Sequence, residues 1–157
     1  MCLILDTDIV HLVFPRPARN YVPVHEAITE RRARIVYGGG RLLTEYQGMG
    51  EFWRLLYRLD QQGSARKVSD NKVDLETESV CESGLCRSND QHIIGLARVS
   101  GARLLCTDDG SLMRDFTDPA LISEPRGKVY KRPAHVDLIR QKCQHVWVAK
   151  KRRKKAR

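Results

Sequence analysis

Acidic side chains follow two apolar segments of this chain at points where strands are expected to end. Asp6 and Asp8 come directly after Leu3-Ile4-Leu5, and the pair Asp108-Asp109 comes after Leu104-Leu105-Cys106-Thr107. In parallel α/β sheets, ligand sites form just beyond the carboxyl ends of the strands. We therefore expect the two groups of acids to converge on one crevice.

Glu45 lies in a segment whose apolar residues recur at helical spacing from Leu42 to Leu59, which predicts one core-facing helix. Its position between Leu42 and Met49 places Glu45 on the apolar side of that helix. A buried carboxylate needs a cation, a metal ion or a proton, because an unpaired buried charge is costly. Glu45 is therefore expected to have a partner.

Asp90 follows Ser88 and Asn89 at the start of another helical pattern, which ends at Gly101. Ser, Asn and Asp are favoured at helix N-termini, where they cap free backbone N–H groups and interact well with the helix dipole. Capping alone explains an acid at this position. By itself, Asp90 therefore does not indicate catalysis.

The segments around these acids alternate between strand and helix patterns, with the weakest pattern over 60–89. We predict strands within 2–5, 34–37, 65–69, 103–107 and 128–131, and helices within 9–14, 22–33, 42–59, 73–81, 90–101, 111–116 and 134–147. This alternation predicts an α/β fold with three layers (α/β/α) around a mostly parallel central sheet of four to five strands. Residues 1–147 are expected to form a single domain.

The net charge of +9 is concentrated at the end of the chain. Residues 148–157 are expected to form a basic, disordered tail, and without its seven cations residues 1–149 carry only +2. A block of like charges suits attraction to phosphate backbones, although a merely solubilising terminus or a nuclear-targeting signal remains open. The nucleic-acid-binding residues predicted there are Lys150, Lys151, Arg152, Arg153, Lys154, Lys155 and Arg157.

The chain has neither a run of eighteen apolar residues nor the basic and long apolar regions of a secretory signal at its start. Five cysteines, an odd number, argue against a disulfide framework and for reduced thiols. We therefore expect a cytoplasmic protein without a membrane segment.

Four short motifs in order along the chain resemble the PIN-domain nucleases over about residues 3–116. They are Leu-Ile-Leu-Asp6-Thr-Asp8, Thr44-Glu45, Asn89-Asp90-Gln-His-Ile-Ile-Gly-Leu-Ala97 and Leu-Leu-Cys-Thr107-Asp108-Asp109. The resemblance implies a parallel sheet with helices on both faces, and a catalytic site made by acids in this order. By this resemblance the acids of the catalytic site are Asp6, Glu45, Asp90 and Asp109. Adjacent Asp108 is the alternative to Asp109, and Asp8 is a possible extra ligand.

Clustered carboxylates repel one another and select hard cations, so we expect the acids to bind Mg²⁺ or Mn²⁺ in a two-metal-type site. The resemblance implies an endoribonuclease that leaves a 5′-phosphate and a 3′-hydroxyl without a covalent intermediate, acting on RNA in preference to DNA. Thr107 or Asp8 would position the water or a ligand, and His92 would contact substrate unless it is simply a partly buried helix residue. A toxin or prokaryotic defence effector, with an antitoxin or regulatory protein as partner and a homodimeric state, is the expected biological setting.

Two other functions remain open. Asp6-Thr-Asp8 after an apolar strand is similar to the nucleophile and general acid of haloacid-dehalogenase-like phosphatases, with Asp108-Asp109 in the place of their metal motif. That function leaves Glu45 and Asp90 without a role. The second is a catalytically silent nucleic-acid-binding module that relies on the basic tail.

Overall fold

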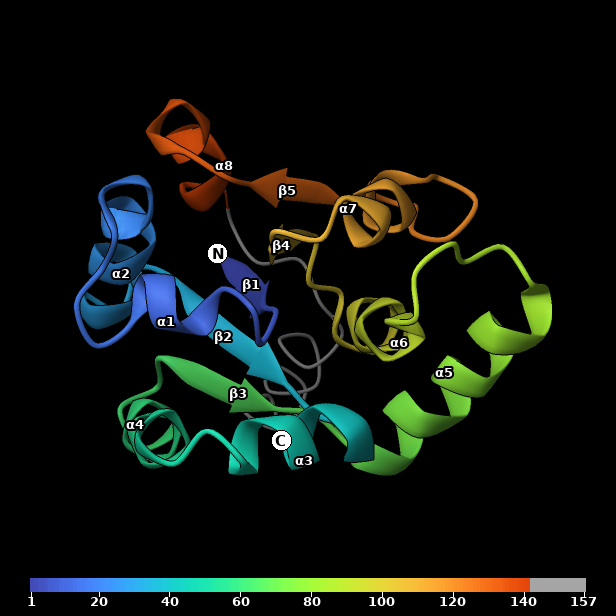
Figure 1. The fold of residues 1–157 in the computed structure, drawn as a ribbon, viewed down its shortest axis with the longest axis horizontal. Coiled ribbons are helices and arrows are strands. Elements are labelled where there is room, and N and C mark those ends of the chain that lie inside the picture. Colours follow the sequence, from blue (N-terminus) through green and yellow to red (C-terminus); the bar gives the residue numbers. More distant parts are fainter. Residues whose placement is uncertain (142–157) are drawn as a thin grey trace, which may run out of the picture.

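Five short strands form a fully parallel sheet in the computed structural model, which describes residues 1–141 (Figure 1). The strands are β1 (Cys2–Leu5), β2 (Arg34–Tyr37), β3 (Ala65–Lys67), β4 (Leu104–Cys106) and β5 (Lys128–Tyr130), in the order β3-β2-β1-β4-β5. All four neighbouring pairs are parallel. The predicted parallel α/β sheet is therefore confirmed.

Helices cover both faces of this sheet and make the predicted three layers. The first group comprises α1 (Val10–Val13), the 3₁₀ turn η1 (Arg19–Tyr21), α2 (Val22–Thr29), α3 (Gly40–Gln47) and α4 (Glu51–Gln61). The second comprises α5 (Asp70–Ser83), α6 (Gln91–Ser100) and α7 (Gly110–Thr117). The 3₁₀ turn η2 (Pro133–His135) and α8 (Val136–Ile139) follow β5, and α8 contacts α2 and β5. Figure 1 shows α1, α2 and α4 on one side of the strands and α5, α6 and α7 on the other. In the part of the chain described, no helix has the length and apolar character needed to cross a membrane.

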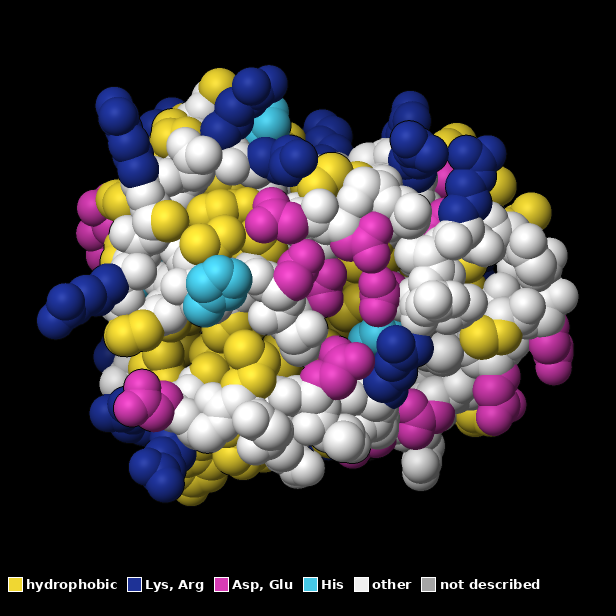
Figure 2. All heavy atoms as spheres, viewed as in Figure 1, with side chains coloured by type: hydrophobic (Ala, Val, Ile, Leu, Met, Phe, Trp, Pro, Cys, Tyr) yellow, Lys and Arg dark blue, Asp and Glu magenta, His cyan; other side chains and the backbone are white. Residues whose placement is uncertain are grey.

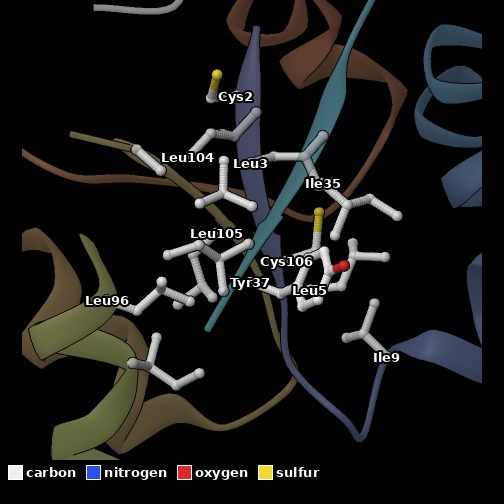
Figure 3. Close-up of a cluster of buried hydrophobic side chains, with 14 of the residues drawn as sticks. Cys2, Leu3, Leu5, Ile9, Ile35, Tyr37, Leu96, Leu104, Leu105 and Cys106 are labelled. Atoms are coloured by element: carbon white, nitrogen blue, oxygen red, sulfur yellow. The ribbon is translucent and has the colours of Figure 1, made fainter. Parts of the chain in front are cut away.

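The core lies between the central strands and these two layers. Every residue of β1 and β4 is buried, as expected for parallel strands covered on both faces. Figure 3 shows Leu3 and Leu5 of β1 clustered with Leu105 and Cys106 of β4. Removal of this apolar surface from water is the main term that favours the fold.

The strand order reverses between β1 and β4. The chain adds β2 and β3 on one side of β1, then returns to place β4 and β5 on the other side. Leu5 pairs with Cys106 in the parallel register, and the Asp6 N–H donates to the Cys106 carbonyl at 3.0 Å. The ends of β1 and β4 therefore form a topological switch point, where ligands bind in open α/β sheets.

Two of the predicted helices are wrong in extent. The segment 42–59 is not one helix, because α3 ends at Gln47 and α4 begins at Glu51, with Gly50 between them at a φ of 36° that favours glycine. The predicted helix 134–147 is represented among described residues only by η2 and α8, and α8 ends before Arg140. Its remainder, and the tail 148–157 with its predicted nucleic-acid contacts, lie outside the described residues.

Most of the polar part of 60–89, where the sequence pattern is weakest, forms α5, which packs closely against α6. A Cβ atom on Gly95 of α6 would lie only 2.4 Å from Thr77 Oγ1 of α5, so only glycine allows this approach. Ser69 begins α5, and its side chain accepts a hydrogen bond from Lys72 N at 3.4 Å. The close contact between the two helices fixes the place of α6, whose N-terminus carries Asp90.

The cysteines do not all follow the prediction of reduced thiols. Cys81, Cys86 and Cys106 are free, whereas Cys2 is disulfide-bonded, so the prediction is wrong for Cys2. Burial raises the pKa of the Cys86 thiol to about 11. Cys86 therefore stays protonated at neutral pH.

Candidate functional site

Asp6 is a nearly buried carboxylate at the switch point. It follows β1 directly and is 6% exposed. Its Oδ2 accepts a hydrogen bond from the Thr107 hydroxyl at 2.7 Å, and its Oδ1 accepts one from Thr7 N at 2.8 Å. Thr107 Oγ1 in turn accepts from Asp109 N at 3.1 Å, so one buried hydroxyl joins the acids that follow β1 and β4.

Asp8 lies close to the Asp6 carboxylate, whose charge acts on it. Loss of hydration and repulsion by Asp6 raise the pKa of Asp8 to about 6. Asp8 Oδ2 also accepts from Asp108 N at 3.2 Å, which joins the loops after β1 and β4 a second time. Two carboxylates this close share a proton or bind a cation.

The acids Asp108 and Asp109 have different surroundings. Asp109 begins α7, where its Oδ1 accepts from Ser111 N at 2.9 Å and from Leu112 N at 3.2 Å. Its Oδ2 makes no hydrogen bond within residues 1–141. Asp108 is exposed and lies on the Asp8 side of the cluster. Asp109 is the acid whose charge acts on Asp90.

Asp90 immediately precedes α6, but its side chain makes no capping hydrogen bond. Capping therefore does not explain this acid. Burial, together with the charges of Asp6, Asp109 and Glu45, raises the pKa of Asp90 to about 6. Arg41 Nη2 lies 3.9 Å from Asp90 Oδ1 and opposes the shift. All four acids predicted for the site thus interact electrostatically through Asp90.

Glu45 lies on α3 with its side chain 32% exposed, so it is less buried than the apolar pattern predicted. Its expected partner comes from the same helix, because Arg41 Nε lies 3.3 Å from Glu45 Oε1. Arg41 Nη1 also donates to the Asn89 carbonyl at 2.6 Å. Arg41 therefore connects α3 to the start of α6 and offsets part of the negative charge.

His92 is buried on α6 beside Glu45, with 5% of its side chain exposed. Neither ring nitrogen has a hydrogen-bond partner among residues 1–141, and Nε2 lies 3.7 Å from Glu45 Oε2, too far for a hydrogen bond. Burial and the charge of Arg41 lower the pKa of His92 to about 4. The imidazole is therefore neutral at pH 7 and offers a lone pair or an N–H group to a ligand.

A buried pair that the sequence analysis missed positions Asp90. Asp115 of α7 is 2% exposed, and its carboxylate accepts from Arg87 N, Ser88 N and Ser88 Oγ at 2.9, 2.9 and 2.7 Å. Ser88 Oγ accepts from Asp90 N at 3.3 Å. The available signal was an acid between the buried Leu112 and Phe116, the same reasoning that was applied to Glu45.

These acids gather on one face of the molecule. Figure 2 shows a band of acidic side chains in the middle of this face, with a histidine and a basic side chain beside it. As the side chains stand, no three His, Cys, Asp or Glu residues among the 141 described are grouped closely enough to hold a metal ion. The chemistry of the donors nevertheless fits a hard cation, which prefers carboxylate oxygens and would relieve their repulsion.

Comparison with known proteins adds no information about function. No protein-family model, curated protein or solved structure matches this chain. The functional argument therefore depends on the placement, burial and charge of the side chains at the switch point.

The contacts of Asp115 lead to a prediction about the position of Asp90. Asp115→Asn replaces one acceptor oxygen with a donor that faces buried N–H groups, so we expect the free energy of unfolding to fall by about 1–3 kcal/mol. The loop before α6 should loosen, and the pKa of Asp90 should move down toward its ordinary value as Asp90 gains hydration. Urea unfolding and an NMR titration of the carboxyl groups measure both effects. Asp137→Asn, whose side chain is 84% exposed, is the control; equal effects of the two substitutions would contradict this role.

The raised pKa of Asp90 predicts how stability depends on pH in the presence of a chelator. The folded protein binds this proton more tightly than the unfolded chain, whose carboxyl titrates near 3.8. The contribution of Asp90 to the free energy of unfolding should therefore decline as pH rises from about 4 to about 6 and stay low above that.

Asp90→Asn removes this penalty, since the amide carries no charge. With a discount for its partial exposure, we expect the variant to be more stable than the wild type at neutral pH by on the order of 1 kcal/mol, and equal to it near pH 4. Chemical unfolding across this pH range is the measurement. Parallel pH profiles for the variant and the wild type would refute the assigned cause.

Proposed function

We propose that this protein is a metal-dependent endoribonuclease of the PIN type that hydrolyses phosphodiester bonds in RNA. The observation that carries the proposal is the crowding of Asp6, Glu45, Asp90 and Asp109 at the switch point between β1 and β4. A structural role would favour one capping acid or one ion pair, not several carboxylates crowded enough to raise the pKa of Asp8 and Asp90. Groups with perturbed pKa values in a ligand-binding position are candidates for function.

Mg²⁺ or Mn²⁺ held by these four acids, with Asp8 and Asp108 nearby, would supply Lewis acidity toward a phosphate oxygen and toward a water molecule. The protein's own groups have separable roles. The Thr107 hydroxyl orients Asp6, and the Ser88–Asp115 pair holds the backbone of Asp90. Neutral His92 would donate a hydrogen bond to substrate or ligate the cation beside Glu45. The products would be a 5′-phosphate and a 3′-hydroxyl.

The biological setting is part of the same proposal and rests on the resemblance of the four motifs. We place the protein in the cytoplasm as a homodimeric toxin or prokaryotic defence effector, restrained by an antitoxin or regulatory protein. Fold and site chemistry support the reaction class only, because one fold serves many functions.

A haloacid-dehalogenase-like phosphatase is the second candidate, and one observation favours it. Burial and the charge of the neighbouring Asp6 raise the pKa of Asp8 to about 6. Asp8 could therefore carry a proton while Asp6 is ionised, as a general acid beside a nucleophile does. This candidate predicts an aspartyl-phosphate on Asp6 and turnover of small phosphomonoesters, neither of which the nuclease proposal expects.

Cleavage of end-labelled RNA and DNA, with Mg²⁺, Mn²⁺ or a chelator, tests the proposal. The wild type should cut RNA only with a metal ion, and Asp6→Asn and Asp90→Asn should lower kcat by about a hundredfold or more, because each removes charge that acts on the reacting phosphate. Asp137→Asn keeps the fold and lies in an exposed ion pair with Arg140, so its rate should equal that of the wild type.

Cleavage by Asp6→Asn at the wild-type rate would eliminate the assigned site. If neither the wild type nor any variant cleaves RNA, and a phosphoryl group can be trapped on Asp6 of the wild type, the phosphatase would be favoured. RNA binding without hydrolysis under any metal condition would instead favour the catalytically silent module.

A further inference from the structure

A pocket of about 730 Å³ opens beside the acids, on the side of Asp108. Its walls come from η1 and from the segment that joins β5 to η2. The polar residues that line it, besides Asp108, are Arg19, Asn20, Tyr21, Lys131, Arg132 and His135. Residues distant in sequence therefore meet around one hollow next to the candidate active site.

The basic side chains of this pocket form no ion pairs within residues 1–141. Arg19, Lys131 and Arg132 are exposed. Figure 2 shows basic side chains and a histidine over the α8 and β5 end of the face, next to the acidic band. Three unpaired cations in one concave site form a ready place for an anion.

The pocket is built on ordered structure. The Tyr130 hydroxyl donates to the Asn20 carbonyl at 2.7 Å, and the Tyr21 and Tyr130 rings lie 5.8 Å apart. These contacts fix η1 against β5. The Tyr21 hydroxyl makes no hydrogen bond within residues 1–141. Burial and nearby acidic groups, including Asp108 and Asp8, raise its pKa well above the usual value, so it remains a protonated donor.

We propose that this pocket binds backbone phosphates of single-stranded RNA and directs the strand toward the acids of the candidate site. Arg19 and Arg132 would hold phosphate oxygens, for which the planar guanidinium group is suited, and Lys131 would add a mobile charge. Asp108 lies where the pocket meets the acidic cluster. Its negative charge would repel phosphates that move toward the acids, unless a bound cation neutralises them. The inference rests on the proposed nuclease function and assigns its substrate path.

Salt-dependent binding of a fluorescent single-stranded RNA, measured by anisotropy in chelator on the full chain, tests the pocket. Arg19→Gln combined with Arg132→Gln should weaken binding roughly tenfold at about 0.1 M salt and reduce the slope of log K against log salt by about 1.4, the loss of two phosphate contacts. The seven tail cations are present in every variant, so the difference isolates the pocket.

Arg54→Gln combined with Arg58→Gln is the matched control. These two exposed arginines lie on α4, where they line a separate pocket with Trp53 and Tyr57. The control pair should bind RNA like the wild type. The inference is overturned if the double variant of Arg19 and Arg132 keeps the wild-type RNA affinity and salt slope. It is also overturned if the double variant of Arg54 and Arg58 loses as much RNA affinity.

Cleavage assays on the same proteins separate this inference from the nuclease proposal. The double variant Arg19→Gln with Arg132→Gln, here called the pocket pair, should have a higher KM than the wild type and a similar kcat, because the substitutions leave the acids intact. If the wild type does not cleave RNA but the pocket pair still weakens binding, the nuclease proposal fails and the pocket inference stands. If Asp6→Asn abolishes cleavage while the pocket pair binds and cleaves normally, the pocket inference fails and the nuclease proposal stands.

Discussion

Repulsion among carboxylates is the constraint on which the candidate site depends. The parallel pairing of β1 with β4 brings Asp6 and Asp109 to adjoining strand ends, and α6 adds Asp90. Burial and the charges of neighbouring acids raise the cost of ionising Asp8 and Asp90, so the fold must supply compensation. It does so through the Thr107 hydroxyl, the Arg41 guanidinium and the raised pKa values of Asp8 and Asp90. A bound cation would complete this compensation, and the neighbouring cationic pocket would supply the substrate's phosphates.

The central sheet and the strand-end acids could be predicted from sequence because they depend on local patterns. Each buried strand is a short apolar run followed by turn residues, and β2 begins and ends as predicted at Arg34 and Tyr37. Asp6 and Asp109 then follow their strands by position alone. Glu45 also required only a local argument, since its partner Arg41 lies one helical turn away.

The remainder of the site depends on contacts between distant segments. The residues around Asp90 predict a cap, and only the family resemblance makes it a ligand. In the structure the loop before Asp90 is held by Asp115 through Ser88, and the Asp90 carboxylate makes no capping hydrogen bond. The periodic apolar residues hid the break at Gly50, because apolar spacing on two successive helices can match that of one longer helix. The cationic pocket was not foreseen, since Arg19 and Arg132 lie 113 positions apart in the printed sequence and meet only in the fold.

The central claim is that the acids around Asp6 form one cation site. Calorimetric titration with Mn²⁺ above pH 6, where Asp8 and Asp90 are ionised, tests it without any assumption about substrate. We expect the wild type and Asp137→Asn to bind Mn²⁺ alike, and Asp6→Asn and Asp90→Asn to lose most of the affinity. Binding should weaken as pH falls below the raised pKa values of Asp8 and Asp90. Equal Mn²⁺ affinity in the wild type and both site variants, or no binding by any of them, would contradict the account.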